Sequence, residues 1–149
     1  MKKILSIIIT GILIASVFVG CGNEKKEQST NNTNKVEENK NENPIDGFKT
    51  ALEKAGLTVG KNETLAYEMV GATSGQKFKV NGELLEVYYY DESKLNDEGK
   101  KYLEEAKKGS MDVSGFSVPV VCKGDLVLAR LDDHKDKDKI IEVLNSYKQ

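Results

Sequence analysis

Cys122 and His134 are the residues whose types could provide a nucleophile and its base. The chain contains two cysteines and one histidine. A catalytic thiol needs a base within hydrogen-bonding reach and a third group that orients that base. His134 follows Cys122 across a predicted hairpin, and the sequence offers no third group. Cys122 also lies on the apolar face of a predicted strand, where a free cysteine usually behaves as a small hydrophobic residue. We therefore assign no catalytic residue and expect a protein that is not an enzyme.

The densest group of carboxylates lies at residues 132–138, which read DDHKDKD. Such a cluster could hold calcium, but this one lacks the alternate oxygen ligands, the turn glycine and the distal glutamate of an EF-hand loop. Its interleaved lysines would repel a cation. Acidic residues are favourable at the N-terminus of a helix, and a helix is predicted to follow. We therefore expect these residues to cap that helix, and we assign no metal site and no cofactor.

Three consecutive tyrosines are the most suggestive feature for binding. Side chains alternate between the two faces of a strand, so Tyr88 and Tyr90 share a face with Glu86, while Tyr89 lies on the other face. Arg130, on the last predicted strand, can join the first group. An exposed strip of Glu86, Tyr88, Tyr90 and Arg130 would suit a cell-surface protein, a peptide or a glycan. The alternative, that both faces of the sheet are covered, stays open.

The N-terminus predicts export and a lipid anchor. Lys2 and Lys3 precede an apolar run from Ile4 to Gly20, as in a signal peptide. The run ends in FVGCG, at residues 18–22, which resembles the lipobox of bacterial lipoproteins. That resemblance implies removal of residues 1–20, lipidation of Cys21 with acyl chains such as palmitate, and a location on the extracytoplasmic face of the cell membrane. An uncleaved anchor helix and ordinary secretion remain alternatives, since Phe18 stands where leucine is usual.

Residues 21–43 are predicted to be the lipidated cysteine and a disordered tether. The segment from Gly22 to Asn43 has Val36 as its only aliphatic residue and is dominated by asparagine, lysine and glutamate. Such a composition cannot bury enough apolar surface to offset the entropy lost on ordering. Its charges nearly cancel, so it is not a polybasic membrane patch.

Residues 44–149 are predicted to form one extracytoplasmic domain. Asn43-Pro44 begins a first helix that Gly56 ends, and residues 62–70 fit either a helix or a strand. Alternation on both sides of Asn81-Gly82 predicts a hairpin. Further elements follow from periodicity: a helix at 93–108, a strand at 115–122, a strand at 126–131 and a helix at 136–147. The fold class is α+β, with about four strands in two hairpins, antiparallel or mixed, and about three helices.

The stretch Gly115–Tyr147 bears a weak resemblance to the end of thioredoxin-like folds. Ser117-Val118-Pro119-Val120 places a proline at the start of a predicted strand, followed by a hairpin and a final helix. No C-x-x-C pair occurs, so the resemblance implies a module that is redox-inactive or dependent on a partner.

Composition narrows the function further. The chain has 149 residues, a net charge of -2, no tryptophan and a single arginine, which argues against nucleic-acid binding. The sequence thus favours a membrane-anchored lipoprotein whose small domain is a non-catalytic binding module. A thioredoxin-like module and a structural or immunity-type surface protein are the alternatives.

Overall fold

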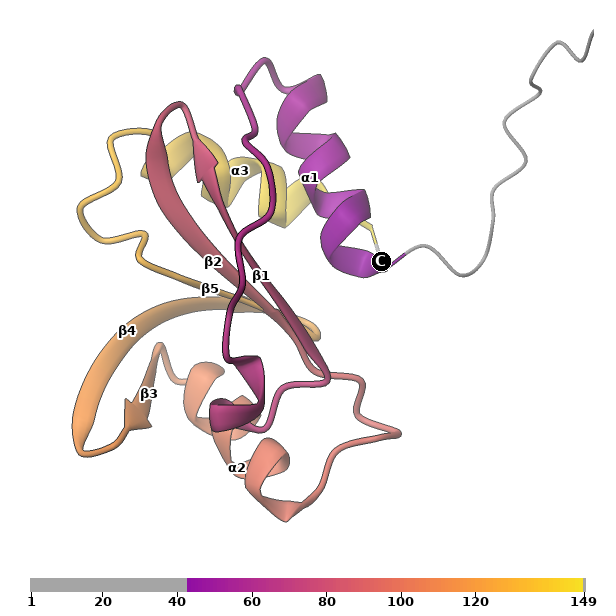
Figure 1. Cartoon of the computed structure of the whole chain (residues 1–149), viewed down its shortest axis with the longest axis vertical. Coiled ribbons are helices and arrows are strands. Elements are labelled where there is room, and N and C mark those ends of the chain that lie inside the picture. Colours follow the sequence, from indigo (N-terminus) through magenta and orange to yellow (C-terminus); the bar gives the residue numbers. More distant parts are fainter. Residues whose placement is uncertain (1–42, 149) are drawn as a thin grey trace, which may run out of the picture. The chain divides into compact units, whose positions relative to one another are not determined.

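A five-stranded antiparallel sheet organises residues 43–148, the part of the chain that the computed structural model describes (Figure 1). The predicted signal segment, Cys21 and the tether up to residue 42 lie outside the described residues, as does residue 149. In chain order the elements are α1 (Pro44–Lys54), the 3-10 helix η1 (Tyr67–Val70), β1 (Ser74–Val80), β2 (Glu83–Tyr89), α2 (Asp97–Ala106), β3 (Ser110–Val113), β4 (Phe116–Lys123), β5 (Leu126–Ala129) and α3 (Lys137–Ser146). The strand order in the sheet is β1-β2-β5-β4-β3. The predicted α+β class is confirmed.

The first helix and the first hairpin form as the sequence predicts. The side chain of Asn43 caps α1 by accepting a hydrogen bond from the main-chain N–H of Ile45 at 3.1 Å. Asn81 and Gly82 connect β1 to β2 with positive φ values of 48° and 91°. A two-residue turn with both φ values positive matches the twist of a hairpin.

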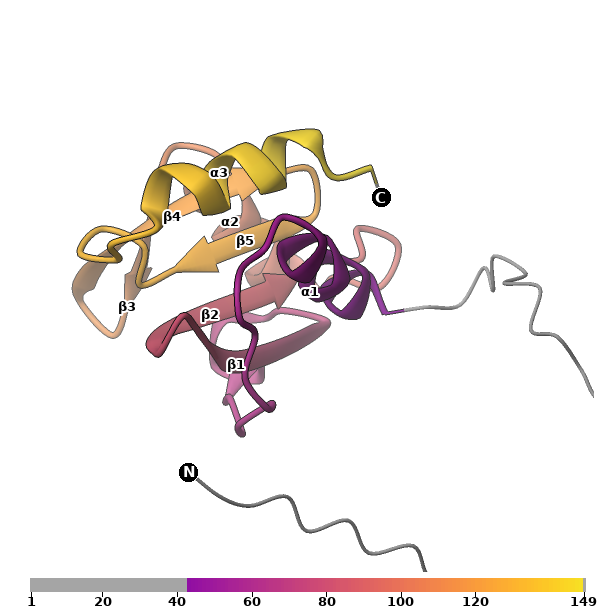
Figure 2. The same cartoon turned by 90° about the horizontal axis from the view of Figure 1, so that it is seen from above.

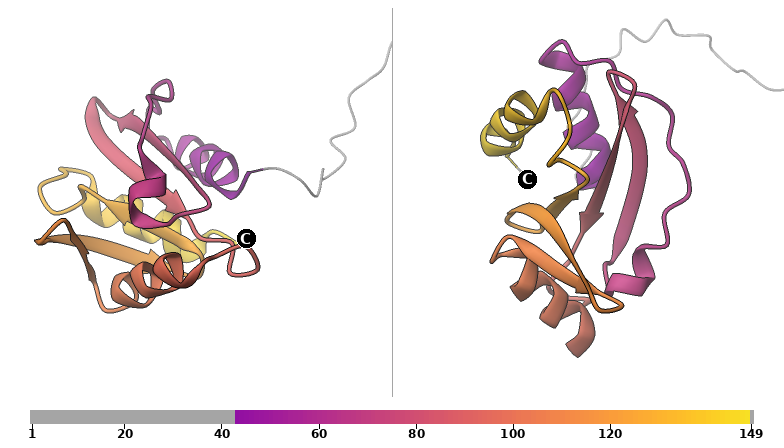
Figure 3. Two further views of the ribbon diagram at one scale, coloured as in Figure 1. Left: turned by 60° about the horizontal axis from the view of Figure 1, so that its bottom comes forward. Right: turned by 90° about the vertical axis from the view of Figure 1, so that its left-hand side faces the viewer.

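Both faces of the sheet are covered. One face packs against α1 and α3, and Figure 2 shows these two helices over the same side of the strands. Phe48, Leu85 and Leu128 lie at the centre of this core. The other face packs against η1 and α2 (Figure 3). Tyr90 and Met111 belong to this second core. The strand residues therefore alternate between two apolar cores, which we call the α1/α3 core and the α2/η1 core.

Four details differ from the sequence expectations or complete them. β3 was not predicted, and it pairs with the first half of β4. α2 begins at Asp97 rather than near residue 93, because the side chain of Asn96 accepts a hydrogen bond from the Gly99 N–H and caps the helix there. Residues 62–70 combine one bridge to the edge of β1, at Glu63, with η1. Pro119 is the fourth residue of β4 rather than the start of a strand.

Lys123, at the end of β4, holds the C-terminal end of α3. Its Nζ donates to the carbonyl oxygens of Leu144 at 2.9 Å and Tyr147 at 2.8 Å, and also to that of Asn145. The last carbonyls of a helix have no partner within the helix and carry its negative dipole end. One ammonium group therefore satisfies three of them and ties α3 to the sheet.

Candidate functional site

The sheet splits where β5 ends, and the split forms a groove. β5 has four residues, whereas its neighbours β2 and β4 have seven and eight. β5 pairs with β2 from Glu86 onwards and with β4 from Val120 onwards, so the first residues of both long strands have no partner on that side. β4 curves strongly away over this stretch (Figure 1). A cavity of about 700 Å³ occupies the gap.

The groove has an apolar floor and a charged rim. Its volume lies in the range of sites that bind small molecules or peptide side chains. The floor comes from the segment before η1 and from η1, β2, β3, β4 and β5, and it includes Leu65, Val70, Leu84, Met111, Val118 and Ala129. The rim lies on β2 and on the loop after β5, and it includes Glu83, Glu86, Arg130, Asp132, Asp133 and His134.

Glu86, Tyr88 and Arg130 form one polar chain in the wall of the groove. Arg130 Nε donates to Glu86 Oε1 at 2.7 Å, and the Tyr88 hydroxyl donates to Glu86 Oε2 at 3.0 Å. Burial, and next the charge of Glu86, raise the pKa of Tyr88, so this phenol stays protonated as a donor. The hydrogen bond to Glu86 likewise raises the pKa of Arg130. These polar contacts hold the guanidinium of Arg130 at the groove through its Nε atom.

Arg130 reaches this position through an unusual backbone conformation. Its φ is 62°, in the left-handed region that few residues other than glycine adopt. Leu126 and Leu128 point into the α1/α3 core, so regular alternation would send the side chain of Arg130 there too. The left-handed conformation instead ends β5 and brings the side chain to Glu86 on the other face. Backbone strain of this kind is concentrated at functional sites.

The structure brings three of the four predicted binding residues together and places the fourth elsewhere. Glu86, Tyr88 and Arg130 line the groove together. Tyr90 does not. The expectation of an exposed strip is wrong for both tyrosines, because Tyr88 is only 7% exposed although it borders the groove. The ring of Tyr90 is fully buried in the α2/η1 core, and its hydroxyl donates to the carbonyl of Val70 at 3.0 Å. The alternative reading, in which both faces of the sheet are covered, holds for this part of β2, because η1 and α2 pack over it.

His134 is a groove residue that sequence reasoning did not assign. It is buried, its Nδ1 accepts a hydrogen bond from the Asp136 N–H at 3.1 Å, and the same nitrogen lies 3.5 Å from Glu83 Oε2. Nε2 has no hydrogen-bond partner in the described structure. Glu83 fixes the loop next to it by accepting from the Lys135 N–H at 2.9 Å, and this contact lowers the pKa of Glu83. The loop after β5 is therefore tied to the start of β2.

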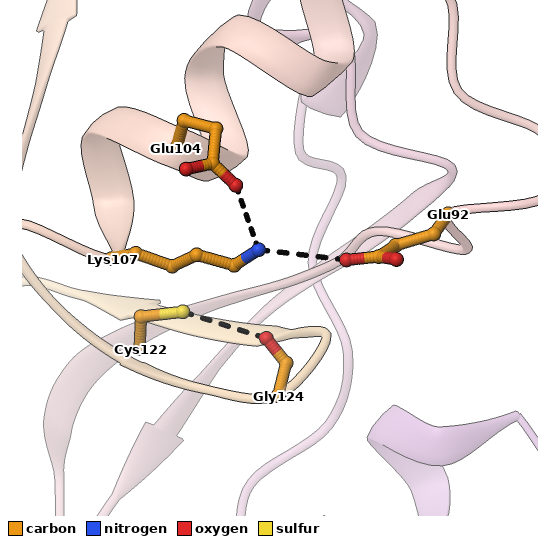
Figure 4. A network of polar contacts seen from close by, with 5 residues as sticks. All are labelled: Glu92, Glu104, Lys107, Cys122 and Gly124. Atoms are coloured by element: carbon orange, nitrogen blue, oxygen red, sulfur yellow. Dashed lines mark hydrogen bonds and ion pairs between the residues drawn. The ribbon is translucent and has the colours of Figure 1, made fainter.

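Cys122 lies away from the groove, beside a separate ion-pair network (Figure 4). Its Sγ contacts the carbonyl of Gly124 at 3.5 Å, and burial raises its pKa above the usual value. Nearby, Lys107 binds Glu104 at 2.8 Å and Glu92 at 3.5 Å. A raised pKa disfavours the reactive thiolate. The contacts of Cys122 and His134 within residues 43–148 do not include one another, so no nucleophile and base are paired.

Neither a metal centre nor a membrane-spanning helix is found in the described part of the chain. Residues 43–148 contain no group of three or more histidine, cysteine or acidic side chains placed to hold a metal ion. The same residues contain no helix long and apolar enough to cross a membrane. Comparison of the chain with protein-family models, with curated proteins and with solved structures finds no match.

Proposed function

We propose that this protein is a lipid-anchored bacterial lipoprotein whose domain binds a ligand outside the cytoplasm, in the groove at the end of β5. The anchor rests on the sequence of residues 1–22, in which Cys21 follows an apolar run and a small residue. Two or three acyl chains on that cysteine hold a protein stably at a membrane.

The groove is the single observation that carries the binding role. It combines a largely apolar floor with polar groups already held in place, which is the usual composition of a ligand site. Arg130 is held by Glu86, and Glu86 in turn by Tyr88, so ordering the guanidinium costs little when a ligand binds. Binding rather than catalysis is favoured, because the groove has no serine, threonine, cysteine or lysine in its lining to act as a nucleophile, and residues 43–148 hold no group of metal ligands.

The anchor is tested by cell fractionation of the Cys21→Ala variant. We expect the unchanged protein to be in the membrane fraction, processed and labelled by a fatty-acid probe, and the variant to lose the label and the processing. A variant that is still labelled and processed would show that Cys21 is not the anchor.

The binding role is tested by crosslinking on intact cells. A photoreactive amino acid replaces Met69, which is 63% exposed and lines the groove. The matched control carries the same amino acid in place of Glu142, an exposed residue of α3, which covers the opposite face of the sheet. We expect an adduct that forms at position 69 and not at position 142. Equal labelling at both positions, or none at either, would contradict the binding role.

A further inference from the structure

We infer that the ligand of this groove is an extended peptide segment that pairs with the free edge of β4 and carries apolar side chains and a basic residue. The inference rests on the proposed binding role and adds the chemical class of the ligand.

The first part of β4 has an unpaired edge. Its residues Phe116–Pro119 pair with β3 on one side only, because β5 ends at Ala129. The Val120 N–H donates to the Gly109 carbonyl at 3.0 Å, which makes Ser110–Pro119 a pair without hydrogen bonds between its own members. Hydrogen-bonded and non-hydrogen-bonded pairs alternate along an antiparallel ladder. Asp112–Ser117 lies two positions from Ser110–Pro119, so it is also a pair without hydrogen bonds between its members.

The main-chain groups of Ser117 and Pro119 therefore point away from β3, toward the gap. Ser117 offers one N–H and one carbonyl, and Pro119 offers one carbonyl. No partner is recorded for these three groups within residues 43–148. Peptides that add a strand to an exposed sheet edge bind through such main-chain groups, while pockets for alternate side chains give specificity.

The apolar surroundings fit the side chains of such a strand. Val118 lines the groove, and Phe116 lies on the same face of β4 with 75% of its surface exposed. Met69 lies on the groove at 63% exposure. Phe116 and Met69 are the large hydrophobic residues that the described structure leaves exposed. A strand paired with Ser117 would place alternate side chains against Phe116 and Val118 and over the floor of the groove.

The charges of the rim favour a peptide with a basic residue. Glu83 is bound by Lys135 at 3.3 Å and Asp132 by Lys137 at 2.9 Å. Asp133, by contrast, is exposed and takes part in no ion pair or hydrogen bond recorded for residues 43–148. It is the carboxylate at the rim that remains available to a lysine or arginine of the ligand.

Arg130 adds a contact suited to a peptide backbone. Its recorded contact with Glu86 uses only Nε, so the terminal nitrogens of the guanidinium remain able to donate. Because Glu86 already neutralises its charge, a neutral acceptor such as a peptide carbonyl fits this group better than an anion. A purely apolar ligand such as a fatty acyl chain would use neither Arg130 nor the edge of β4.

The probe is a display library of random linear peptides, selected on the full-length chain in detergent micelles. We expect enrichment of sequences with alternating apolar residues and at least one lysine or arginine. Failure to enrich any peptide would overturn the inference. If the crosslinker at position 69 still forms its adduct in that case, the binding role stands and only the ligand class is wrong.

Two matched pairs of variants then test how the enriched peptide binds. Ser117→Pro removes the one N–H that faces the gap without breaking a bond to β3, and its ring blocks the approach of a strand. We expect it to weaken binding about tenfold or more, as loss of one hydrogen bond and of close approach predicts. Ser117→Ala keeps the N–H and is expected to bind as the unchanged protein does. Equal affinity of these two variants would contradict strand pairing.

Asp133→Lys tests the charge, and Glu142→Lys on the opposite face is its control. Both raise the net charge equally, so long-range attraction changes alike. We expect Asp133→Lys to weaken the affinity for the peptide about threefold or more, and Glu142→Lys to cause no such loss. Because Asp133 is exposed, this variant also serves if Ser117→Pro should fail to fold. Equal binding by the two charge variants would overturn the proposed role of Asp133 and the preference for basic peptides.

Discussion

Replacing Glu86 by alanine should destabilise the domain mainly through Tyr88. The carboxylate of Glu86 accepts from Arg130 Nε at 2.7 Å and from the Tyr88 hydroxyl at 3.0 Å. Tyr88 is only 7% exposed, so its hydroxyl has little access to water when the acceptor is removed. The side chain of Arg130 is 59% exposed and can be hydrated again.

These exposures set the size of the effect. A buried hydroxyl without a partner costs about 1–3 kcal/mol. An ion pair with one exposed member contributes about 0.2–1 kcal/mol. The unfolding free energy should therefore fall by about 2–3 kcal/mol in Glu86→Ala. For a domain of this size, that corresponds to a melting temperature lower by about 10 °C.

The assay is urea unfolding of the full-length chain, monitored by circular dichroism and arranged as a double-mutant cycle. Tyr88→Phe removes the hydroxyl that Glu86→Ala would leave without a partner. We expect Glu86→Ala to cost about 1–2 kcal/mol less in the Tyr88→Phe background than in the unchanged protein. Glu142→Ala, at an exposed position of α3, is the control and should have little effect. An equal cost of Glu86→Ala in both backgrounds would refute the account of this polar chain.

Three further predictions follow from other contacts. Lys123→Met should lower the unfolding free energy by about 2 kcal/mol, because three carbonyls at the end of α3 lose their donor. Thermal unfolding measures this loss. An unchanged unfolding free energy would show that water replaces the ammonium group. Burial raises the pKa of both Tyr88 and Tyr90 above their ordinary 10.0, so above about pH 10 the unfolded chain loses these protons while the folded protein keeps them. The unfolding free energy must therefore fall as the pH rises further, by up to about 1.4 kcal/mol per pH unit for each tyrosine. Tyr88→Phe should make urea unfolding less sensitive to alkaline pH. An unchanged dependence of the unfolding free energy on pH would contradict this. Pro119→Ala places an additional N–H on the free edge of β4 and should promote concentration-dependent self-association in size-exclusion chromatography, since proline protects strand edges; elution that is the same as that of the unchanged protein would argue against an open edge.

The local elements were predictable because their signals are local. Asn43 with Pro44, the turn at Asn81-Gly82 and the apolar spacing of Ile140, Val143 and Leu144 each act within a few residues, and each forms the element expected. β3 was missed because four residues give too little alternation to recognise, and its strand character comes from pairing with β4.

The groove could not be predicted, because long-range pairing creates it. Glu86, Tyr88 and Arg130 were candidates from strand alternation, but their meeting depends on β5 lying between β2 and β4 and on the left-handed backbone of Arg130. Neither feature has a sequence signal, since an arginine at the end of a strand does not suggest a positive φ. The burial of Tyr90 depends in the same way on η1 and α2 folding back over the sheet.

Amide hydrogen exchange at Ser117, measured by NMR on the full-length chain with and without a selected peptide, shows whether a peptide pairs with the free edge of β4. We expect fast exchange at Ser117 in the protein alone, because its N–H faces the gap. Val118, in a hydrogen-bonded pair with Met111, should exchange slowly throughout. Addition of the peptide should slow exchange at Ser117 and leave Val118 as it was. Slow exchange at Ser117 before any peptide is added, or exchange that a bound peptide does not change, would contradict the claim that the groove holds an extended peptide against β4.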